Sequence, residues 1–521
     1  MLDVIKVFIK NNNKKIFYLL YLSVCAVFSV NLDGLLGLIF FILWSLVGWF
    51  LLMREPDKPS ICKYSRYWLL VPLLILIVSR ALPFALYGNH PLGYDTGFVK
   101  YNISQERSNS LAVLGPLRVT ESTGARIVNK LLIELGFSDD FIMYWLYGLI
   151  VVLIGLMVYL LVRSYFDDST AIVAFYLYSI SAVQYLFYWY YFWKNALCLL
   201  LVLVVFYCLE KKTVRAYVIA LPLIVFVLIS QKSIAVLLLA SLLVYYFFTK
   251  RLVWQKTFFL LLAVMTLFIA WYYREVIVGV WQLMISGFRV EQDVFKIKEG
   301  QFIAWRDYLS MSYFYFPLAM IGWWYNRRKL NLFFIFGFIS AIIVLSQFIF
   351  YKRFFVYFDL LVIVYAASAI RLLYAKMIKY SSRALVVMIF IFVASLLIIN
   401  FAVLVVQTKP LITKESLENI VAMQDESPGL SIFSQDSNFM PWLYGFSGHP
   451  LISPGWTSVK WNYADWNRYW LASSSEKRQL LTSLNMSLIL YNSNNDQDLV
   501  ADECFQKINE HFYLFSCNFG I

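Results

Sequence analysis

Charged residues are scarce in this sequence. Of its 521 residues only 14% are charged, whereas 61% are hydrophobic. A soluble protein of this length needs far more polar surface to cover its core, so the composition excludes that class. Apolar runs of about 20 residues recur along most of the chain, and each can cross about 30 Å of hydrocarbon. The sequence therefore predicts a polytopic membrane protein that is mainly α-helical.

Several motifs of soluble enzymes are also missing. There is no GxxxxGK[ST] run to hold a nucleotide phosphate, which argues against direct use of ATP. There is no GxSxG elbow, which argues against an esterase. His90, His449 and His511 are the only histidines, and no Cys/His cluster has the spacing of a metal site. Cys504 and Cys517 fall in the expected outer tail, where a disulfide between them and two free thiols are both open alternatives.

The net charge of +13 is concentrated in short gaps between the apolar runs. If the N-terminus is inside, the inner segments hold 22 of the 44 Lys and Arg residues but only six of the 31 acids. This bias is typical of cytoplasmic loops, so it predicts an inner N-terminus and an outer C-terminus rather than binding to nucleic acid. No cleavable signal peptide is evident, because the first apolar run lacks a small-residue cleavage site.

About thirteen spans are expected. They lie at 16–30, 35–53, 67–87, 141–162, 170–186, 196–209, 216–230, 233–248, 257–274, 311–325, 330–349, 354–370 and 384–406. Three units follow: an additional N-terminal hairpin (1–66), a transmembrane domain (67–406) with outer loops at 88–140 and 275–310, and an extracytoplasmic tail (407–521). The tail has soluble composition, and we predict a small α/β domain there. Its expected strands are Leu430–Ser434, Ser487–Tyr491 and His511–Cys517, and its expected helices are Lys414–Met423 and Ser475–Leu484.

The stretch from Arg80 to Tyr101 stands where a long apolar run ends and the first outer loop begins. Arg80 lies about two turns before the helix end, where a charge is costly in lipid and usually faces protein. Asp95 follows in a Pro/Gly-rich turn, and Gly93 and Gly97 let the backbone approach a ligand closely. We therefore predict that Asp95 faces the outer side and acts as a catalytic base. The alternative is that Asp95 caps a following helix and Arg80 snorkels.

Four further cations stand at predicted outer ends of spans. With Arg80 they are candidates for binding a donor phosphate: Lys194, Lys232, Lys352 and Arg353. Lysine binds phosphate as a point charge, and arginine can bind it through two parallel hydrogen bonds. Each has a structural alternative: a snorkelling lysine in an aromatic belt at Lys194, a polar turn at Lys232, and a pairing of Lys352 or Arg353 with Asp359.

Aromatic residues gather in the outer regions among Gly and Pro. Candidates for contacting the acceptor are Tyr94, Trp442, Tyr444, His449 and Trp456. Aromatic faces flanked by polar groups suit a carbohydrate. They suit equally well the packing of the tail against the outer face of the membrane domain.

Together these features resemble the GT-C class of integral-membrane glycosyltransferases. That class includes protein O-mannosyltransferases, lipid A aminoarabinose transferases and oligosaccharyltransferase catalytic subunits. The resemblance extends from about Tyr67 to the end of the chain. It rests on Arg80 before the first outer loop, Asp95 in HPLGYDTG, the span openings WKNALCLLL and YKRFFVYFDL, and WLYGFSGHPLISPGW in the tail.

The sequence departs from the family pattern in three places. Many members have two adjacent acids in the first loop, where this chain has Asp-Thr. The short outer turn Tyr190–Asn195 has no acid, and the tail has no WWDYG motif. These departures disfavour oligosaccharyl transfer to asparagine. No cofactor is therefore expected to be required, and a divalent metal stays an open alternative.

The resemblance implies a sugar (hexosyl or pentosyl) transferase of the plasma (inner) membrane, with its active site on the extracytoplasmic side. Its donor would be a polyprenyl-phosphate sugar, and its acceptor a hydroxyl of a lipid, glycan or protein. Asp95 would accept the proton of that hydroxyl, and a single displacement would invert the anomeric configuration. The alternatives are a polysaccharide polymerase or ligase and a lipid-linked sugar transporter (flippase).

Overall fold

The computed structural model describes residues 2–32, 34–53, 66–108, 123–211, 213–249, 302–329, 331–347, 351–426, 429–435, 439–453, 463–484, 488–491, 500–501 and 503–516, with short pieces between 263 and 271. Most of the expected span 257–274 and of the outer loop 275–310 lie outside these residues, as do Trp456 and Cys517. Cys504 is disulfide-bonded, whereas Cys25, Cys198 and Cys208 are free thiols.

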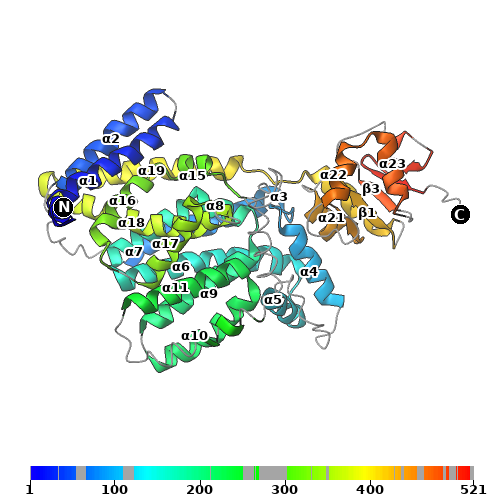
Figure 1. The fold of residues 1–521 in the computed structure, drawn as a ribbon, viewed down its shortest axis with the longest axis horizontal. Coiled ribbons are helices and arrows are strands. Elements are labelled where there is room, and N and C mark those ends of the chain that lie inside the picture. Colours follow the sequence, from blue (N-terminus) through cyan, green and yellow to red (C-terminus); the bar gives the residue numbers. More distant parts are fainter. Residues whose placement is uncertain are drawn as a thin grey trace.

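The chain is mainly helical, with a helical bundle at one end and a small mixed domain at the other (Figure 1). The bundle helices are α1 (Leu2–Val30), α2 (Gly34–Met53), α3 (Leu70–Tyr87), α6 (Tyr147–Tyr165), α7 (Asp168–Ile180), α8 (Ala182–Trp189), α9 (Trp193–Lys211), α10 (Val214–Ser230), α11 (Lys232–Thr249), α16 (Phe316–Asn326), α17 (Leu332–Leu345), α18 (Tyr351–Tyr380) and α19 (Arg383–Gln407). Short 3₁₀ and π segments precede α3 and α6, at Arg66–Leu69 and Phe141–Leu146.

Six helices in the described part of the chain are long and apolar enough to cross a membrane, or seven if α7 and α8 form one span bent by 50°. Helices α10, α11 and α17 are apolar but shorter. Every expected span except 257–274 overlaps a described helix, and 170–186 extends over both α7 and α8. The expected total of about thirteen spans and their sidedness stay predictions.

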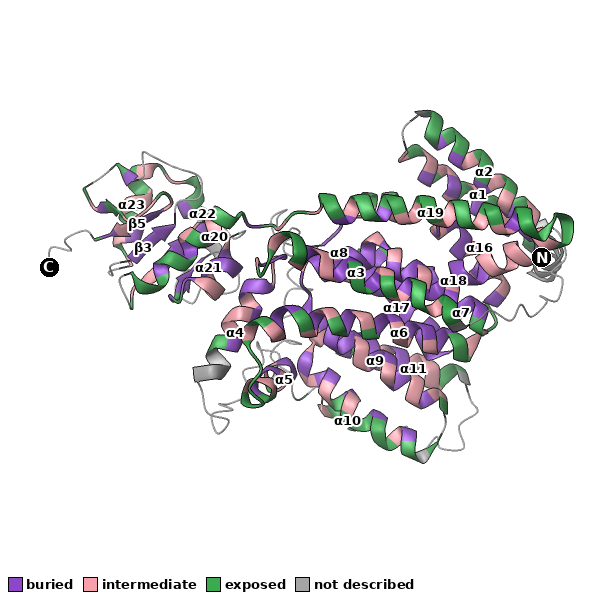
Figure 2. Ribbon diagram, turned by 180° about the vertical axis from the view of Figure 1, so that it is seen from behind, coloured by how far each residue is buried: buried purple, intermediate pink, exposed green. Residues whose placement is uncertain are grey.

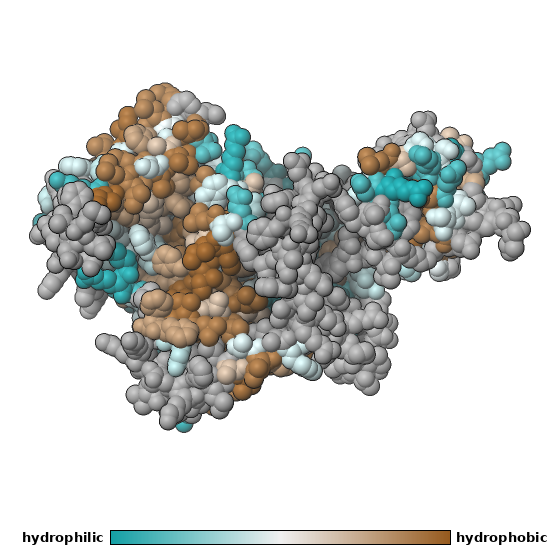
Figure 3. All heavy atoms as spheres, in the orientation of Figure 1, coloured by the Kyte–Doolittle hydropathy of each residue, from teal (hydrophilic) through white to brown (hydrophobic). Residues whose placement is uncertain are grey.

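Helix α18 is the centre of the bundle, and α19 lies on its outside. Most of the spanning part of α18 is buried, whereas only 11% of the corresponding part of α19 is buried (Figure 2). Glycines let neighbouring helices approach α18 closely: a Cβ on Gly322 would lie 1.9 Å from the carbonyl oxygen of Tyr365, and one on Gly337 would lie 2.6 Å from Leu361 Cβ. Apolar side chains cover much of the bundle surface, while the tail domain is largely hydrophilic (Figure 3).

The N-terminal hairpin α1–α2 is fixed to the bundle through Phe17 of α1 and the C-terminal end of α2. The carbonyl oxygen of Leu51, near the end of α2, accepts hydrogen bonds from Tyr325 and from Lys376 Nζ at 2.9 Å. Phe17 of α1 stacks on Trp324 of α16 at 4.3 Å. These contacts satisfy an otherwise unpaired carbonyl group at a helix end. The hairpin is therefore an integral part of the bundle.

The tail domain is α/β, and a five-stranded sheet forms its core. The strands are β1 (Ser431–Ser434), β2 (Leu451–Ile452), β3 (Leu488–Tyr491), β4 (Phe505–Lys507) and β5 (Phe512–Phe515), in the order β2-β1-β3-β5-β4. β1 pairs in parallel with β2 and β3, while β5 is antiparallel to β3 and β4. The helices are α20 (Lys414–Val421), α21 (Met440–Phe446), α22 (Tyr463–Leu471) and α23 (Ser474–Thr482). The three expected strands and two expected helices of the tail are thus confirmed.

Two helices lie in the expected first outer loop, and the first of them packs against the tail domain. They are α4 (Thr96–Ser108) and α5 (Thr123–Glu134), and both are seen beside the tail-facing end of the bundle (Figure 1). A third short helix, α15 (Trp305–Ser312), precedes α16. The expected base, Asp95, stands immediately before α4 and is therefore placed at this junction.

Candidate active site

The turn that carries Asp95 is held from two sides. Gly93 packs directly on the α8–α9 turn, since a Cβ there would lie 2.3 Å from the carbonyl oxygen of Trp189. His90 Nε2 lies 2.7 Å from the carbonyl oxygen of Ile412, and the Leu411 N–H donates to the carbonyl oxygen of Leu92 at 3.1 Å. The turn therefore bridges the bundle and the segment that enters the tail domain, and neither attachment uses the carboxylate.

The Asp95 side chain is not used as a helix cap. It is of intermediate exposure, and among the described residues its carboxylate oxygens accept no hydrogen bond. Thr96 Oγ1 instead donates to the carbonyl oxygen of Gly93 at 2.7 Å, closing the turn. The carboxylate therefore keeps its lone pairs for another partner, which disfavours the capping alternative.

Two cations from different helices act on Asp95. Burial raises the pKa of its carboxyl above the ordinary value, and the positive charges of Arg353 and Lys194 offset part of that rise. Lys194 stands in the first turn of α9 and Arg353 in the first turn of α18. The structure thus brings together three predicted site residues that are far apart in the sequence.

Arg353 is oriented by an aromatic ring. Its guanidinium lies over the ring of Phe192, 5.5 Å from the centroid, and its Nε is buried without a hydrogen-bond partner in the described structure. A cation–π contact holds an arginine while leaving its N–H groups available to an anion. The arginine therefore has unused donors beside Asp95.

The α8–α9 turn has an unusual backbone conformation. Tyr191 adopts a left-handed φ of 65°, which is uncommon for a bulky residue. Its N–H donates to the carbonyl oxygen of Tyr188 at 3.0 Å, and its hydroxyl donates to the carbonyl oxygen of Met143 at 2.5 Å. Such conformations persist only where surrounding contacts enforce them, and they cluster at functional sites. Here the turn directs the chain into α9 and thereby places Lys194.

Arg80 is not among the charges that act on Asp95. It is buried in α3, with its guanidinium 5.1 Å and 5.5 Å from the ring centroids of Tyr185 and Tyr188. Its Nη1 donates to Ser79 Oγ at 2.9 Å, while Nε and Nη2 have no hydrogen-bond partner among the described residues. Arg80 faces protein rather than snorkelling to the surface. Tyrosine rings surround the Arg80 guanidinium. Its contact with the donor phosphate stays a prediction.

Lys232 and Lys352 stand near the same end of the bundle. Lys232 opens α11, directly after Gln231, whose side chain reaches α9. Lys352 is the second residue of α18, next to Arg353, and is half-buried. Neither contributes to the charges that act on Asp95. Their predicted contacts with a phosphate remain untested.

Asp359 is not paired with Arg353 or Lys352. It is fully buried, and its two carboxylate oxygens accept hydrogen bonds from Tyr315 at 2.6 Å, Ser181 at 2.9 Å and Gln184 at 3.0 Å. Ser181 also caps α8, so this network fixes the bend between α7 and α8. The pairing alternative is therefore excluded for Asp359. No sequence pattern predicted this network, because its donors are neutral and come from two segments far apart in the sequence, the start of α8 and the residue before α16.

Most of the aromatic candidates for the acceptor join the tail domain to α4. Tyr94 packs edge-on against Trp442 at 5.7 Å, and Tyr101 lies 3.8 Å from Tyr444 between ring centroids. A Cβ on Gly97 would lie 1.9 Å from the carbonyl oxygen of Pro441, so the two backbones touch. These contacts favour the packing alternative.

His449 lies inside the tail domain. Its ring nitrogens are 3.0 Å and 2.7 Å from the carbonyl oxygens of Leu430 and Met423, and the side chain is buried. Both nitrogens are thus engaged with the backbone of its own domain. This geometry favours a structural role over acceptor binding.

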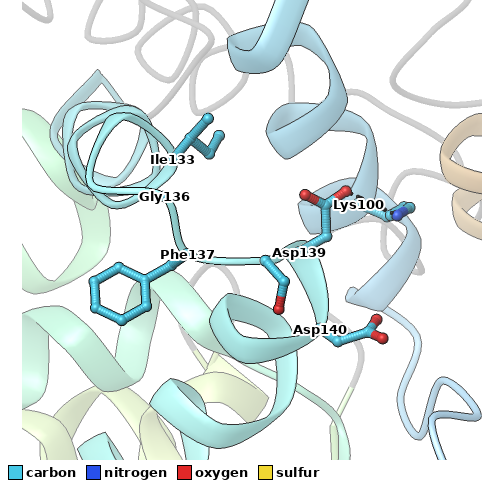
Figure 4. A pocket seen from close by; sticks show the side chains of 7 residues that line it. Lys100, Ile133, Gly136, Phe137, Asp139 and Asp140 are labelled. Carbon is cyan, nitrogen blue, oxygen red and sulfur yellow. Dashed lines mark hydrogen bonds and ion pairs between the residues drawn. The ribbon is translucent and has the colours of Figure 1, made fainter.

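An open pocket of about 540 Å³ lies between α4 and the connection that follows α5 (Figure 4). It is lined by Lys100, Ile133, Gly136, Phe137, Ser138, Asp139 and Asp140. Lys100 Nζ pairs with Asp139 at 3.0 Å, and Asn89 Nδ2 donates to Asp140 at 2.8 Å. The pocket therefore shares its wall with the turn that leads to Asp95. In the part of the chain that the structure describes, no three His, Cys, Asp or Glu side chains form a metal-binding group.

No family model matches the sequence, and no curated protein matches it either. Solved structures do match. The oligosaccharyltransferase of Archaeoglobus fulgidus in its apo form is 14% identical, with a TM-score of 0.58 over 82% of this chain and 70% of that one. The same enzyme, AglB, has been solved with an inhibitory peptide and a dolichol-phosphate, at 13% identity and a TM-score of 0.58.

A second match extends over nearly the whole of the other protein. ArnT from Cupriavidus metallidurans, bound to undecaprenyl phosphate, is 11% identical, with a TM-score of 0.53 over 86% of this chain and 97% of that one. At such identities the likeness concerns the fold. The chain is an integral membrane protein that has the fold of the GT-C proteins represented by AglB and ArnT.

Proposed function

We propose that this protein transfers a sugar from a polyprenyl-phosphate donor to an acceptor hydroxyl on the outer side of the plasma (inner) membrane. The observation that carries the proposal is the group formed by Asp95, Lys194 and Arg353, in which an unpaired carboxylate faces two cations. The fold supports it, because AglB and ArnT structures with this fold hold dolichol-phosphate and undecaprenyl phosphate.

The reaction needs one base and a site for the departing phosphate. The acceptor oxygen forms a bond to the anomeric carbon while the bond from that carbon to the phosphate oxygen breaks. Asp95 takes the proton of the acceptor hydroxyl, and its raised pKa makes it a stronger base than an exposed aspartate. The phosphate leaves as an anion and requires no proton donor. Lys194 and Arg353 stabilise the charge that grows on it.

The acceptor and the sugar are defined only by class. The acceptor is a hydroxyl of a lipid, a glycan or a protein, and the sugar is a hexose or a pentose. The displacement inverts the anomeric configuration, since the hydroxyl attacks opposite the leaving group. No metal takes part in the proposed step.

The direct test uses purified protein and a radiolabelled polyprenyl-phosphate sugar. We expect the label to move to an acceptor, and the product to carry the opposite anomeric configuration. Asp95→Asn should leave the donor intact while remaining folded in the membrane. A transporter would leave the donor chemically unchanged in both proteins, and normal turnover by Asp95→Asn would exclude Asp95 as the base.

A further inference from the structure

A single buried amide joins the three outer helix ends that bear predicted phosphate-binding cations. Asn195, 4% exposed, follows Lys194 in the first turn of α9. Its Nδ2 donates to the hydroxyl of Tyr357 at 3.0 Å, and its Oδ1 accepts from Nε2 of Gln231 at 2.9 Å. Both hydrogen-bonding ends of the side chain are therefore used, and each reaches a different segment.

The partners of Asn195 each stand beside a cation. Tyr357, 1% exposed, lies one turn after Arg353 on α18, so the two side chains share a helix face. Gln231 immediately precedes Lys232, the first residue of α11. Asn195 itself follows Lys194. The amide thus links the backbone positions of Lys194, Arg353 and Lys232 through two hydrogen bonds.

The same turn is braced by the first outer loop. A Cβ on Gly124 of α5 would lie 1.8 Å from Ser230 Oγ, so α5 packs directly against the end of α10. Ser230 Oγ donates to the carbonyl oxygen of Phe226 at 2.6 Å. Gln231 therefore reaches Asn195 from a fixed position, and the link is rigid on both sides.

We propose that Asn195 is a positioning residue for the donor phosphate, holding the ends of α9, α11 and α18 so that their cations converge on one anion. The inference rests on the proposed function. Two hydrogen bonds between uncharged groups orient the helix ends without neutralising any cation. A carboxylate at position 195 could make similar bonds but would compete with the phosphate for the same positive charges.

The test is binding of undecaprenyl phosphate to the purified full-length protein in detergent. Asn195→Leu removes both hydrogen bonds and should raise the Kd roughly tenfold, the size expected when a buried hydrogen-bonded group is lost from a site. Binding of undecaprenol, which lacks the phosphate, should not change. In transfer assays the donor KM should rise more than kcat falls.

Variants that remove only one of the two hydrogen bonds of Asn195 distinguish loss of this linkage from misfolding. Gln231→Leu and Tyr357→Phe each remove one of the two bonds and should each weaken phosphate-lipid binding by less than Asn195→Leu. In a chain carrying both changes, Asn195→Leu should add little further loss, because residues that act as one unit are not additive. Full additivity would overturn the inference.

Asn326→Leu is the matched control. Asn326 is also a buried asparagine, and its Nδ2 donates to Ser368 Oγ at 2.8 Å, joining α16 to α18 away from these cations. It should lower thermal stability to a similar extent and leave the Kd unchanged. An equal loss of affinity in this variant, or an unchanged Kd in Asn195→Leu, overturns the inference about Asn195 but leaves the proposed function standing. Wild-type protein that binds no undecaprenyl phosphate overturns the proposed function and the inference together.

Discussion

The two aspartates Asp95 and Asp359 stand in opposite environments. Asp359 is fully buried, and both of its carboxylate oxygens accept hydrogen bonds from neutral donors, namely Ser181, Gln184 and Tyr315. Asp95 is partly exposed and accepts no hydrogen bond among the described residues, yet two cations act on it. A carboxylate whose two oxygens both accept hydrogen bonds from the protein holds a structure together. A carboxylate that accepts none, and whose pKa is raised by burial, can accept a proton from a substrate.

The contrast also separates the two roles of charge in this bundle. Arg353 and Asp359 lie on the same helix, within two turns, and the sequence allows them to pair. In the structure Arg353 instead acts on Asp95, and Asp359 has neutral partners. A cation consumed by an internal ion pair would be unavailable to a phosphate. Neutral donors at Asp359 therefore leave Arg353 for the site.

The largest expected effect is that of Asp95→Asn on catalysis. Loss of a general base should lower kcat by about 10²–10⁴-fold. At neutral pH the variant should also be somewhat more stable than the wild type. The pKa of Asp95 is raised in the folded protein, so protonation of this carboxyl stabilises the folded wild type below the ordinary carboxyl pKa. That stabilisation is lost as the pH rises through the folded-state pKa. Transfer assays and thermal unfolding at pH 5 and pH 8 measure both effects.

Asp359→Asn should show the reverse pattern. It places an amide NH₂ among three donors, and we expect a loss of about 1–3 kcal/mol of stability from unpaired hydrogen bonds. The activity of the fraction that remains folded should stay within a few fold of the wild type. A thousandfold loss of kcat in a normally folded Asp359→Asn protein would remove the distinction between the two carboxylates.

Arg353→Gln should change both the donor and the pH profile. Removal of the positive charge disfavours the Asp95 carboxylate, so the pKa of Asp95 should rise further. Because the base must be unprotonated, the acidic limb of the kcat profile should move to higher pH. The donor KM should rise roughly tenfold through loss of a charged contact. An unmoved acidic limb would show that Arg353 does not act on the base.

The smallest expected effect concerns the contact between α4 and the tail domain. Gly97→Ala forces a Cβ to 1.9 Å from the carbonyl oxygen of Pro441, so the two elements must separate. We expect a severalfold loss of activity, because that displacement also moves Asp95. Gly148→Ala is the matched control, since its Cβ would meet no atom within 4 Å. It should be neutral or stabilise α6 by up to about 1 kcal/mol.

Composition and periodicity were sufficient for much of the architecture. Long apolar runs predicted the helices, because lipid demands about 20 apolar residues for each crossing. In the tail, the ranges expected from the sequence correspond to the three strands β1, β3 and β5 and to the two helices α20 and α23. The sequence also singled out Asp95, since one acid among glycines after a long apolar run is conspicuous.

The partners of the acid were decided only by tertiary structure. Lys194 and Arg353 lie 159 positions apart in the sequence, and only the packing of α9 and α18 brings both to Asp95. The Asp359 network and the amide of Asn195 were invisible for the same reason. Local sequence carries the periodicity that buries a helix face. It carries no record of which polar groups meet across helices, because those contacts depend on how distant segments pack.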